Sequence, residues 1–285
     1  MEHLTDIGVI KDIFQRHGFS FSKTLGQNFL VNPSVCPRIA EMGNAAEGWG
    51  VIEIGTGIGV LTHELAKRAD KVVAVEIDSR LIPVLEETLA EHKNVTVINA
   101  DVMKTDLKKL IEEHFSGLKV AVCANLPYYI TSPVIMKLLE ERLPISCITV
   151  MVQKEAADRL CAKVGERDCG AITVGVNFYS TPKMLFRVNR GSFMPAPNVD
   201  SAVIRLDISR EPKYTPKDEK LFFKIVHAAF SQRRKQLINP VSAELKIPKQ
   251  ELAEILVSCG IKATARPEEL KMEDFAALCD KVCEK

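Results

Sequence analysis

The stretch GVIEIGTGIGVLT, Gly50 to Thr62, decides the fold. Its first six residues form a short run that is mainly apolar and β-branched, as in a buried strand. Its last residues begin a helical pattern. Alternate glycines separate the two parts, because backbone N–H groups must approach a ligand closely where a strand turns into a helix. Residue 60 is valine, so the loop departs from the dinucleotide fingerprint G-x-G-x-x-G, which counts against a dehydrogenase. The stretch predicts an α/β domain with a ligand at this loop.

Outward from this loop, short apolar runs alternate with longer amphipathic ones, which is typical of parallel strands joined by helical crossovers. The strands that we expect span residues 50–55, 71–77, 95–100, 118–124 and 147–153. The expected helices span residues 58–69, 79–92, 105–114, 133–142 and 154–163, the second opened by Asp78 and Ser79 as caps. Three further β-rich segments predict strands that close the sheet: AITVGVNFY (171–179), KMLFRVN (183–189) and SAVIRLDI (201–208).

The composition changes after residue 208. The segment SREPKYTPKDE (209–219) is dense in proline and charge, and the pattern is helical from there to the end. We therefore expect a Rossmann-like α/β domain with an N-terminal extension over residues 1–210. A smaller all-helical domain is expected over residues 211–285. A chain of 285 residues is long enough for both.

Basic residues are concentrated in one region. The net charge is only +1, but residues 183–235 hold twelve Lys or Arg against five acids, so this region carries +7 and the remainder −6. Arg233, Arg234 and Lys235 follow a helical run, and we expect them to contact RNA phosphates. A solvated helix terminus is the alternative, because cations there also suit the helix dipole. Three arginines could extend the basic surface: Arg187, Arg190 and Arg205.

The eight cysteines are scattered without a C-x-x-C pair, and no histidine stands beside Cys279 and Cys283. Reduced thiols and no metal site are therefore expected. The N-terminus MEHLTDIGVIKDIFQRHG lacks the apolar core of a signal peptide, and no run approaches the length of a membrane span. We expect a cytoplasmic protein without membrane association.

Acidic residues end two of the predicted strands. Glu76 ends the second strand and could accept both ribose hydroxyls, and Asp101 ends the third and could take an adenine amino group. Singly, each acid could equally be a solvated loop residue or a helix cap. Together with the loop at Gly55 they predict a nucleoside site, because ligands in open α/β sheets sit at the carboxyl ends of the strands.

The fourth predicted strand runs into CANLPYYITSP, Cys123 to Pro133. If the nucleoside is S-adenosylmethionine, an exocyclic amino nitrogen is a fitting methyl acceptor, and its lone pair must be oriented more than its proton removed. The Asn125 amide oxygen and the Leu126 carbonyl could each accept one N–H, and Pro127 would hold the turn. Tyr128 could stack on the base. An Asn-x-Pro turn with tyrosines in the core is the alternative.

Several motifs then point to one family. They are LGQNFL (25–30), EIGTGIG (53–59), VVAVEID (72–78), NADV (99–102), NLPYYI (125–130), MVQKEAADRL (151–160), SFMPAPNVDSAV (192–203) and FSQRRKQL (230–237). On these the chain resembles the small-subunit ribosomal RNA adenine N6-dimethyltransferases over nearly its whole length. The resemblance implies that residues 1–210 form a methyltransferase domain and that residues 211–285 dock on RNA or the ribosome. It also implies S-adenosylmethionine as cofactor, with Asn28 and Leu30 closing over it. Gly55 would contact its methionine part, Glu76 its ribose and Asp101 its adenine.

The resemblance also implies how the target base is held. Asn125 would serve both cofactor and target, and Phe193 would stack on the flipped adenine opposite Tyr128. The implied substrate is two adjacent adenosines in the hairpin loop near the 3′ end of small-subunit (16S) rRNA, each methylated twice. The implied partner is a pre-30S ribosomal particle, met by a monomeric enzyme. Thr56 stands where much of the family has proline, and we expect this to change only loop stiffness.

Other readings of the same residues stay open. Large-subunit rRNA adenine methyltransferases of the antibiotic-resistance type share the cofactor loop and NLPY, but lack the glycine of LGQNFL. DNA adenine methyltransferases use an acidic or Asn-Pro-Pro-Tyr tetrad, whereas residue 126 here is leucine. A mainly non-catalytic ribosome-assembly factor is the reading from a different class, and the intact set of pocket residues argues against it.

Overall fold

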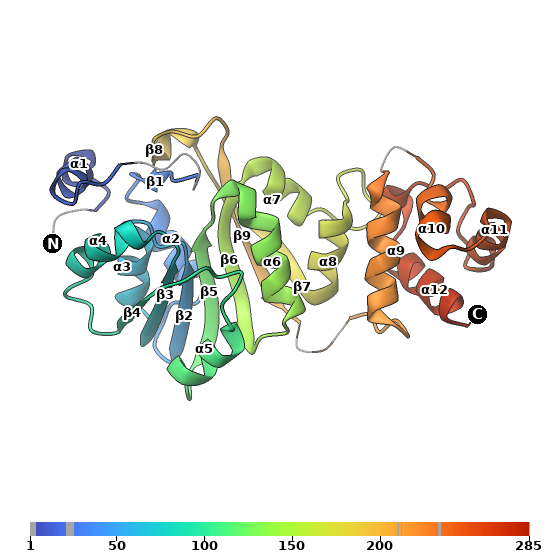
Figure 1. Ribbon diagram of the computed structural model, residues 1–285, viewed down its shortest axis with the longest axis horizontal. Coiled ribbons are helices and arrows are strands. Elements are labelled where there is room, and N and C mark those ends of the chain that lie inside the picture. Colours follow the sequence, from blue (N-terminus) through green and yellow to red (C-terminus); the bar gives the residue numbers. More distant parts are fainter. Residues whose placement is uncertain (1–3, 21–25, 210, 212, 233–234, 285) are drawn as a thin grey trace. The chain divides into compact units, whose positions relative to one another are not determined.

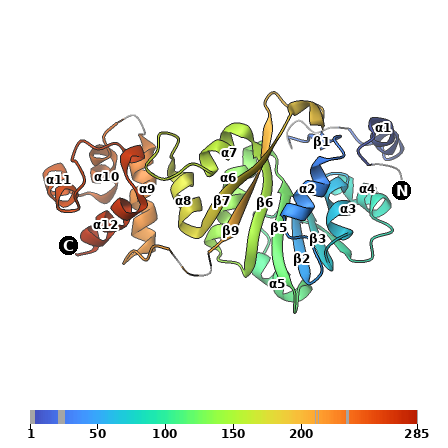
Figure 2. The same ribbon diagram turned by 180° about the vertical axis from the view of Figure 1, so that it is seen from behind.

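A computed structural model describes residues 4–20, 26–209, 211, 213–232 and 235–284 (Figure 1, Figure 2). The chain divides into two compact units. The first comprises residues 1–157 and 183–208, and the second comprises residues 158–182 and 209–285. The chain passes from the first unit to the second for the last time after residue 208, close to the predicted domain boundary at residue 211. Residues 158–182, however, group with the C-terminal helices. Division into two independently folding domains at residue 211 stays a prediction.

A seven-stranded sheet in the order β4-β3-β2-β5-β6-β9-β7 organises the first unit (Figure 1). Its strands are β2 (Trp49–Ile54), β3 (Lys71–Glu76), β4 (Val95–Asn99), β5 (Lys119–Asn125), β6 (Ile145–Gln153), β7 (Ser180–Val188) and β9 (Ser201–Ile208). The pairs from β4 to β6 are parallel, and β9 pairs with β6 in the antiparallel direction. The Rossmann-like prediction is confirmed, and so are the five strands read from the apolar runs.

The strand order reverses at β2, which lies between β3 and β5. Ile54 pairs with Val75 of β3 and with Ala124 of β5, so the carboxyl ends of the three strands meet at one edge of the sheet. Such a reversal opens a crevice between the loops that leave neighbouring strands in opposite directions. Glu76 and Asn125, the last residues of β3 and β5, therefore stand beside the glycine-rich loop.

The predicted helical segments correspond to α3 (Val60–Ala66), α4 (Ile82–Thr88), α5 (Leu107–His114), α6 (Thr131–Glu140) and α7 (Lys154–Leu160), of which only the start belongs to the first unit. The sequence analysis did not predict α1 (Ile7–Arg16) and α2 (Val35–Met42), which precede the sheet. Asp78 caps the short turn before α4 by accepting the N–H of Arg80 at 3.1 Å, as expected. The apolar sides of α2 and α3 pack with β2, β3 and β6 in a core that includes Ile39, Leu65 and Val51.

Two short strands tie the N-terminal segment to the segment around residue 193. Strand β1 (Phe29–Leu30) pairs in the antiparallel direction with β8 (Phe193–Met194), and Leu30 lies opposite Phe193. The N–H of Val31 extends this pairing to the carbonyl of Ser192 at 2.8 Å. Two motifs more than 150 residues apart in the sequence therefore lie side by side.

Helices build the second unit: α8 (Ala171–Tyr179), α9 (Glu219–Ser231), α10 (Ile238–Leu245), α11 (Lys249–Ser258) and α12 (Met272–Cys283). The strand predicted over residues 171–179 is wrong, because this segment is α8. The Thr173 hydroxyl fixes its start by accepting the N–H of Gly170 at 2.9 Å. Phe178 packs against Phe222 and Phe223 of α9, so the helix is buried on most sides. An all-round apolar helix shows no 3.6-residue period and resembles a strand in sequence.

A search of the described residues for membrane-spanning helices found none with the length and apolar character to cross a bilayer.

Candidate active site

A cavity of about 310 Å³ opens at the carboxyl ends of β2, β3, β4 and β5. A volume of this size is within the range of small-molecule sites. All residues that the sequence assigned to cofactor or chemistry line it: Asn28, Leu30, Gly55, Glu76, Asp101, Asn125, Leu126, Pro127, Tyr128 and Phe193. The structure therefore brings these residues together in one place.

The glycine-rich loop needs glycine for conformational reasons. Gly55 and Gly57 adopt φ values of +76° and +58°, a region that other residues rarely occupy. A Cβ atom at residue 57 would also lie only 3.3 Å from the ring of Phe29. The loop therefore holds its backbone N–H groups in a tight turn between β2 and α3, against the floor of the cavity.

The carboxylate of Glu76 is buried and held by three donors. One oxygen accepts the Thr56 hydroxyl at 3.0 Å and the Gly57 N–H at 3.1 Å, and the other accepts the Asp78 N–H at 2.9 Å. Burial raises the pKa of Glu76, whereas these hydrogen bonds oppose the rise. The oxygen that accepts only the Asp78 N–H keeps acceptor capacity for a ligand. The expectation that Thr56 changes only loop stiffness is wrong, since its hydroxyl helps to orient this carboxylate.

Asp101 stands at the mouth of the cavity after β4, with a side chain that is 31% exposed. Its Oδ1 accepts the N–H of Met103 at 2.9 Å, which caps the local turn. Its Oδ2 lies 3.9 Å from the ammonium of Lys104. The residue is therefore both a local cap, as the alternative reading had it, and a carboxylate at the cavity, as the nucleoside reading had it.

The loop after β5 leaves one amide free and fixes one aromatic ring. Asn125 is half-buried, and within the described part of the chain its side chain makes no hydrogen bond. The Tyr128 hydroxyl is hydrogen-bonded to Ser201 Oγ of β9 at 2.9 Å, and burial raises its pKa, so it is a neutral phenol. The Pro127 carbonyl accepts the N–H of Ile130 at 3.2 Å, which closes the turn. The arrangement presents an unpaired amide beside an anchored ring.

The N-terminal motif and the segment around residue 193 complete the wall of the cavity. Leu30 and Phe193 are 4% and 5% exposed, and both belong to the core as well as to the cavity lining. The Asn28 amide nitrogen donates to the Gly26 carbonyl at 3.1 Å, which holds its oxygen on the other side of the amide. Phe193 is therefore both a core residue and a residue of the cavity wall.

Glu53 and Tyr129 are among the lining residues that sequence reasoning missed. Glu53, inside the apolar strand β2, is 1% exposed, and its Oε2 has no hydrogen-bond partner among the described residues. Burial raises the pKa of Glu53 to about 8. Tyr129 lies at the rim and is 59% exposed. A carboxylate within an apolar run was the available signal for Glu53, and the second tyrosine of NLPYY was the signal for Tyr129.

The basic residues singled out in the sequence differ in their exposure and in their partners. Arg233 and Arg234 lie outside the described residues, and Lys235 is exposed. Arg187 and Arg190 are exposed, but Arg205 is engaged within the fold, because it bonds Asp207 and the backbone carbonyl of Met42. Arg205 therefore has fewer donors available for RNA than the two exposed arginines, and its place in an RNA-binding surface stays a prediction.

The residues present fit S-adenosylmethionine. A cationic ligand suits a cavity with several carboxyl groups, and a nucleoside suits a carboxylate that is held in place beside a glycine-rich turn. Glu76 supplies that carboxylate at the end of β3, and apolar side chains supply surfaces for a base on either side: Ile77, Val102 and Met103.

Comparisons with known proteins agree with this geometry. Residues 18–282 match a model of the family described as ribosomal RNA adenine dimethylase. Ribosomal RNA small subunit methyltransferase A of Alkaliphilus oremlandii (strain OhILAs) is 48% identical over 286 residues, covering 100% of both chains. The same-named protein of Bacillus licheniformis is 48% identical over 278 residues, covering 96% of this chain and 95% of that one.

Two solved structures share the fold over most of the chain. A dimethyladenosine transferase from Plasmodium falciparum superposes with a TM-score of 0.72 at 28% identity, covering 88% of this chain and 95% of that one. The 23S rRNA methyltransferase ErmE superposes with a TM-score of 0.67 at 28% identity, covering 90% of this chain and 100% of that one. With its fold, its cavity and its sequence in agreement, the chain belongs to the ribosomal RNA adenine dimethylase family, a family of S-adenosylmethionine-dependent methyltransferases.

Proposed function

We propose that this enzyme dimethylates N6 of two adjacent adenosines in the 3′-terminal hairpin loop of small-subunit (16S) rRNA, within a pre-30S particle in the cytoplasm, and so contributes to small-subunit biogenesis. The observation that carries the proposal is the unpaired amide of Asn125 beside the anchored ring of Tyr128 at the cavity. The full-length identity of 48% to small-subunit methyltransferases, against 28% to a 23S rRNA methyltransferase, supports the choice of ribosomal subunit.

When bound, S-adenosylmethionine supplies a methyl group activated by a cationic sulfonium. Glu76 would hold the ribose hydroxyls in charge-assisted hydrogen bonds, and Asp101 would accept a hydrogen bond from the amino group of the cofactor's adenine. Asn28 and Leu30 would cover the ligand from the N-terminal segment, and the turn at Gly55 would contact its methionine part. These residues bind and orient, and none of them needs to transfer a proton.

The target base leaves its stack and enters between Tyr128 and Phe193. The Asn125 amide oxygen and the Leu126 carbonyl each accept one N–H of the N6 amine, which directs its lone pair at the methyl group. The nitrogen becomes cationic on transfer and then loses its proton to water, so no general base is required. For the second transfer one N–H remains, and one acceptor suffices to orient it.

The direct test uses pre-30S particles from cells that lack this modification. Incubation with the enzyme and S-adenosylmethionine should produce two adjacent N6,N6-dimethyladenosines, which mass spectrometry of the small-subunit rRNA fragments would locate. Modification of large-subunit rRNA alone would assign the enzyme to the antibiotic-resistance type. Binding of particles without any methyl transfer would support the non-catalytic assembly factor instead.

The assignment of Glu76 predicts a large loss of cofactor affinity. Glu76→Ala removes the carboxylate that would hold the ribose, so S-adenosylmethionine binding should weaken by about 2–3 kcal/mol in isothermal titration calorimetry. Thr56→Val removes only one of the donors that orient the carboxylate, and a smaller loss of about 0.5–1.5 kcal/mol is expected. Glu113→Ala, at an exposed acid of α5, serves as the control. Unchanged affinity in Glu76→Ala would refute the assignment.

The basic motif predicts a salt-dependent docking surface. Changing Arg233, Arg234 and Lys235 together to glutamine should weaken rRNA binding and flatten its salt dependence by about 0.7–0.9 units of log–log slope per lost phosphate contact. Affinity for S-adenosylmethionine should not move. Filter binding over a series of salt concentrations measures both the affinity and the slope.

A control with the same change of charge separates docking from net charge. Three exposed lysines elsewhere in the second unit serve for it: Lys246, Lys249 and Lys262. If both triple variants keep the parental slope, the motif is surface charge and RNA docks elsewhere.

A further inference from the structure

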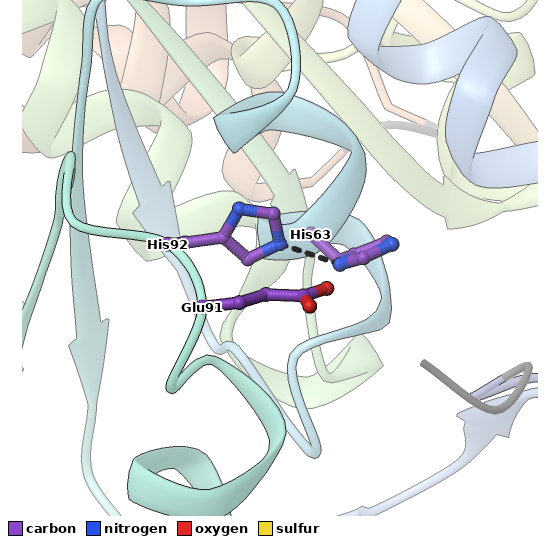
Figure 3. A group of neighbouring side chains, drawn as sticks. All are labelled: His63, Glu91 and His92. Carbon is purple, nitrogen blue, oxygen red and sulfur yellow. Dashed lines mark hydrogen bonds between the residues drawn. The ribbon is translucent and has the colours of Figure 1, made fainter.

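Two histidines and a glutamate gather outside the cavity. His63 lies on α3, and Glu91 and His92 lie in the loop between α4 and β4. Figure 3 shows the three side chains pointing toward one another from these two segments. Each can offer one ligand atom such that all three atoms lie within 4.8 Å of one another. The cysteine pattern predicted no metal site, and the histidines, 29 residues apart, gave no spacing signal.

The two imidazoles are joined by a hydrogen bond. His63 Nδ1 lies 2.6 Å from His92 Nε2, so one ring donates a proton to the other and at least one ring is a neutral acceptor. Neutral imidazole is the form that binds a metal ion. A small rotation of either ring would place both nitrogens on one ion, because tetrahedral zinc needs a nitrogen separation of only about 3.3 Å.

The charged groups around the cluster permit a cation to bind there. Lys67 is a nearby positive group, but its ammonium is paired with Glu64 at 3.0 Å, and Arg68 bonds the same carboxylate at 2.6 Å. Glu91 is exposed, and no ion pair holds its carboxylate within the described part of the chain. The carboxylate can therefore turn to an ion at the two rings without giving up another partner.

We propose that His63, Glu91 and His92 form a binding site for one divalent transition-metal ion of borderline softness, with zinc as the fitting occupant. Two imidazole nitrogens and one carboxylate oxygen suit zinc, which would complete its tetrahedron with water. Magnesium and calcium prefer oxygen ligands, so this donor set discriminates against them.

Such an ion would join α3 to the loop before β4. The same helix begins at the glycine-rich loop, and its residues Val60 and Leu61 line the cavity. The N–H of His63 also donates to the carbonyl of Gly59 at 2.9 Å, so the metal ligand is one helical turn from the loop. The ion is too far along the helix to touch the reacting atoms, and its role is to stabilise this part of the fold.

The test titrates zinc chloride into the reduced full-length protein in a phosphine reductant. We expect one zinc per chain by equilibrium dialysis with metal analysis, and a melting temperature raised by several degrees with saturating zinc. Magnesium should leave the melting temperature unchanged. His63→Gln and His92→Gln should each weaken zinc binding at least about tenfold, and Glu91→Gln should weaken it less. His114→Gln, on α5 and outside the cluster, should bind as the parent does.

Cobalt identifies the ligands independently of the variants. Cobalt bound at this site should show visible d–d bands without the near-ultraviolet charge-transfer band of a thiolate, and Cys283→Ser should leave the spectrum unchanged. Melting each variant in a chelator shows that its fold is intact. The proposal is overturned if the parent binds no zinc, if the two histidine variants bind it as tightly as the parent, or if Cys283→Ser abolishes binding.

Discussion

Replacing Asn125 with alanine should lower single-turnover methylation of small-subunit rRNA about 100-fold or more, and should change RNA affinity much less. The reason is positional. The N6 lone pair is delocalised into the adenine ring, so the rate depends on how well the two N–H groups are held while the nitrogen meets the methyl group. Removing one of two acceptors leaves the amine free to rotate, although the base can still stack. The measurement is a single-turnover assay at saturating S-adenosylmethionine, because Asn125 also lines the cofactor cavity.

The structure makes this variant informative. The Asn125 side chain has no hydrogen bond among the described residues, so its loss breaks no hydrogen bond of the described fold. Thermal stability should stay within about 1 kcal/mol of the parent, as for substitutions that break no buried contact. Asn239→Ala, at a half-buried asparagine of α10, is the matched control and should keep full activity. A parental single-turnover rate for Asn125→Ala would show that another group orients the amine.

Much of this site could be predicted because parallel strands give it a simple geometry. Apolar runs marked the strands. Gly55, Glu76 and Asn125 stand at the carboxyl ends of three of these strands, so they had to meet wherever those strand ends met. The cavity lining confirms that these residues share one place. Their individual roles toward cofactor and base stay predictions, which the variants above address.

Other features depend on contacts between distant residues and leave no local pattern. The segment of α8 has the composition of a strand, and only its packing against Phe222 and Phe223 shows that a helix buries it better. The hydroxyl of Thr56 gains its role from a carboxylate twenty residues later, across the β2–β3 pair. Neither fact follows from periodicity or spacing in a single sequence.

Glu53 is the feature with the clearest consequence for stability. It faces the cavity from β2 at 1% exposure, and burial raises its pKa to about 8, with the charge of Glu76 adding to the rise. Thr62 lies close enough to oppose the shift, but its hydroxyl forms no hydrogen bond of ordinary geometry within the described residues. The folded protein therefore carries a protonated carboxyl here at neutral pH.

This burial predicts that the cofactor-free enzyme loses stability as the pH rises through neutrality. The folded pKa of Glu53 lies above the ordinary value of 4.5, so its contribution is fully present below about pH 4.5 and is lost as the pH rises toward about 8. Glu53→Gln stays neutral throughout, so it should match the parent at pH 5 within about 1 kcal/mol. By pH 8 the free energy of unfolding of Glu53→Gln should exceed that of the parent by about 2–4 kcal/mol. All other titrating groups are common to the two proteins, so their contributions cancel in this difference.

Urea unfolding of both proteins from pH 5 to pH 9 measures this difference. Glu64→Gln is the control, because burial opposes the shift at Glu64 but hydrogen bonds from Arg68 and Lys67 dominate and lower its pKa. The contribution of Glu64 is therefore constant above about pH 5, and its variant should run parallel to the parent. Parallel curves for Glu53→Gln as well would mean that Glu53 is ionised in the folded enzyme, held by a cation or by water. A steeper loss of stability with rising pH in the parent alone would show that Glu53 carries a proton in the folded enzyme. A bound cationic cofactor should then release this proton, because a positive charge in the cavity favours the carboxylate.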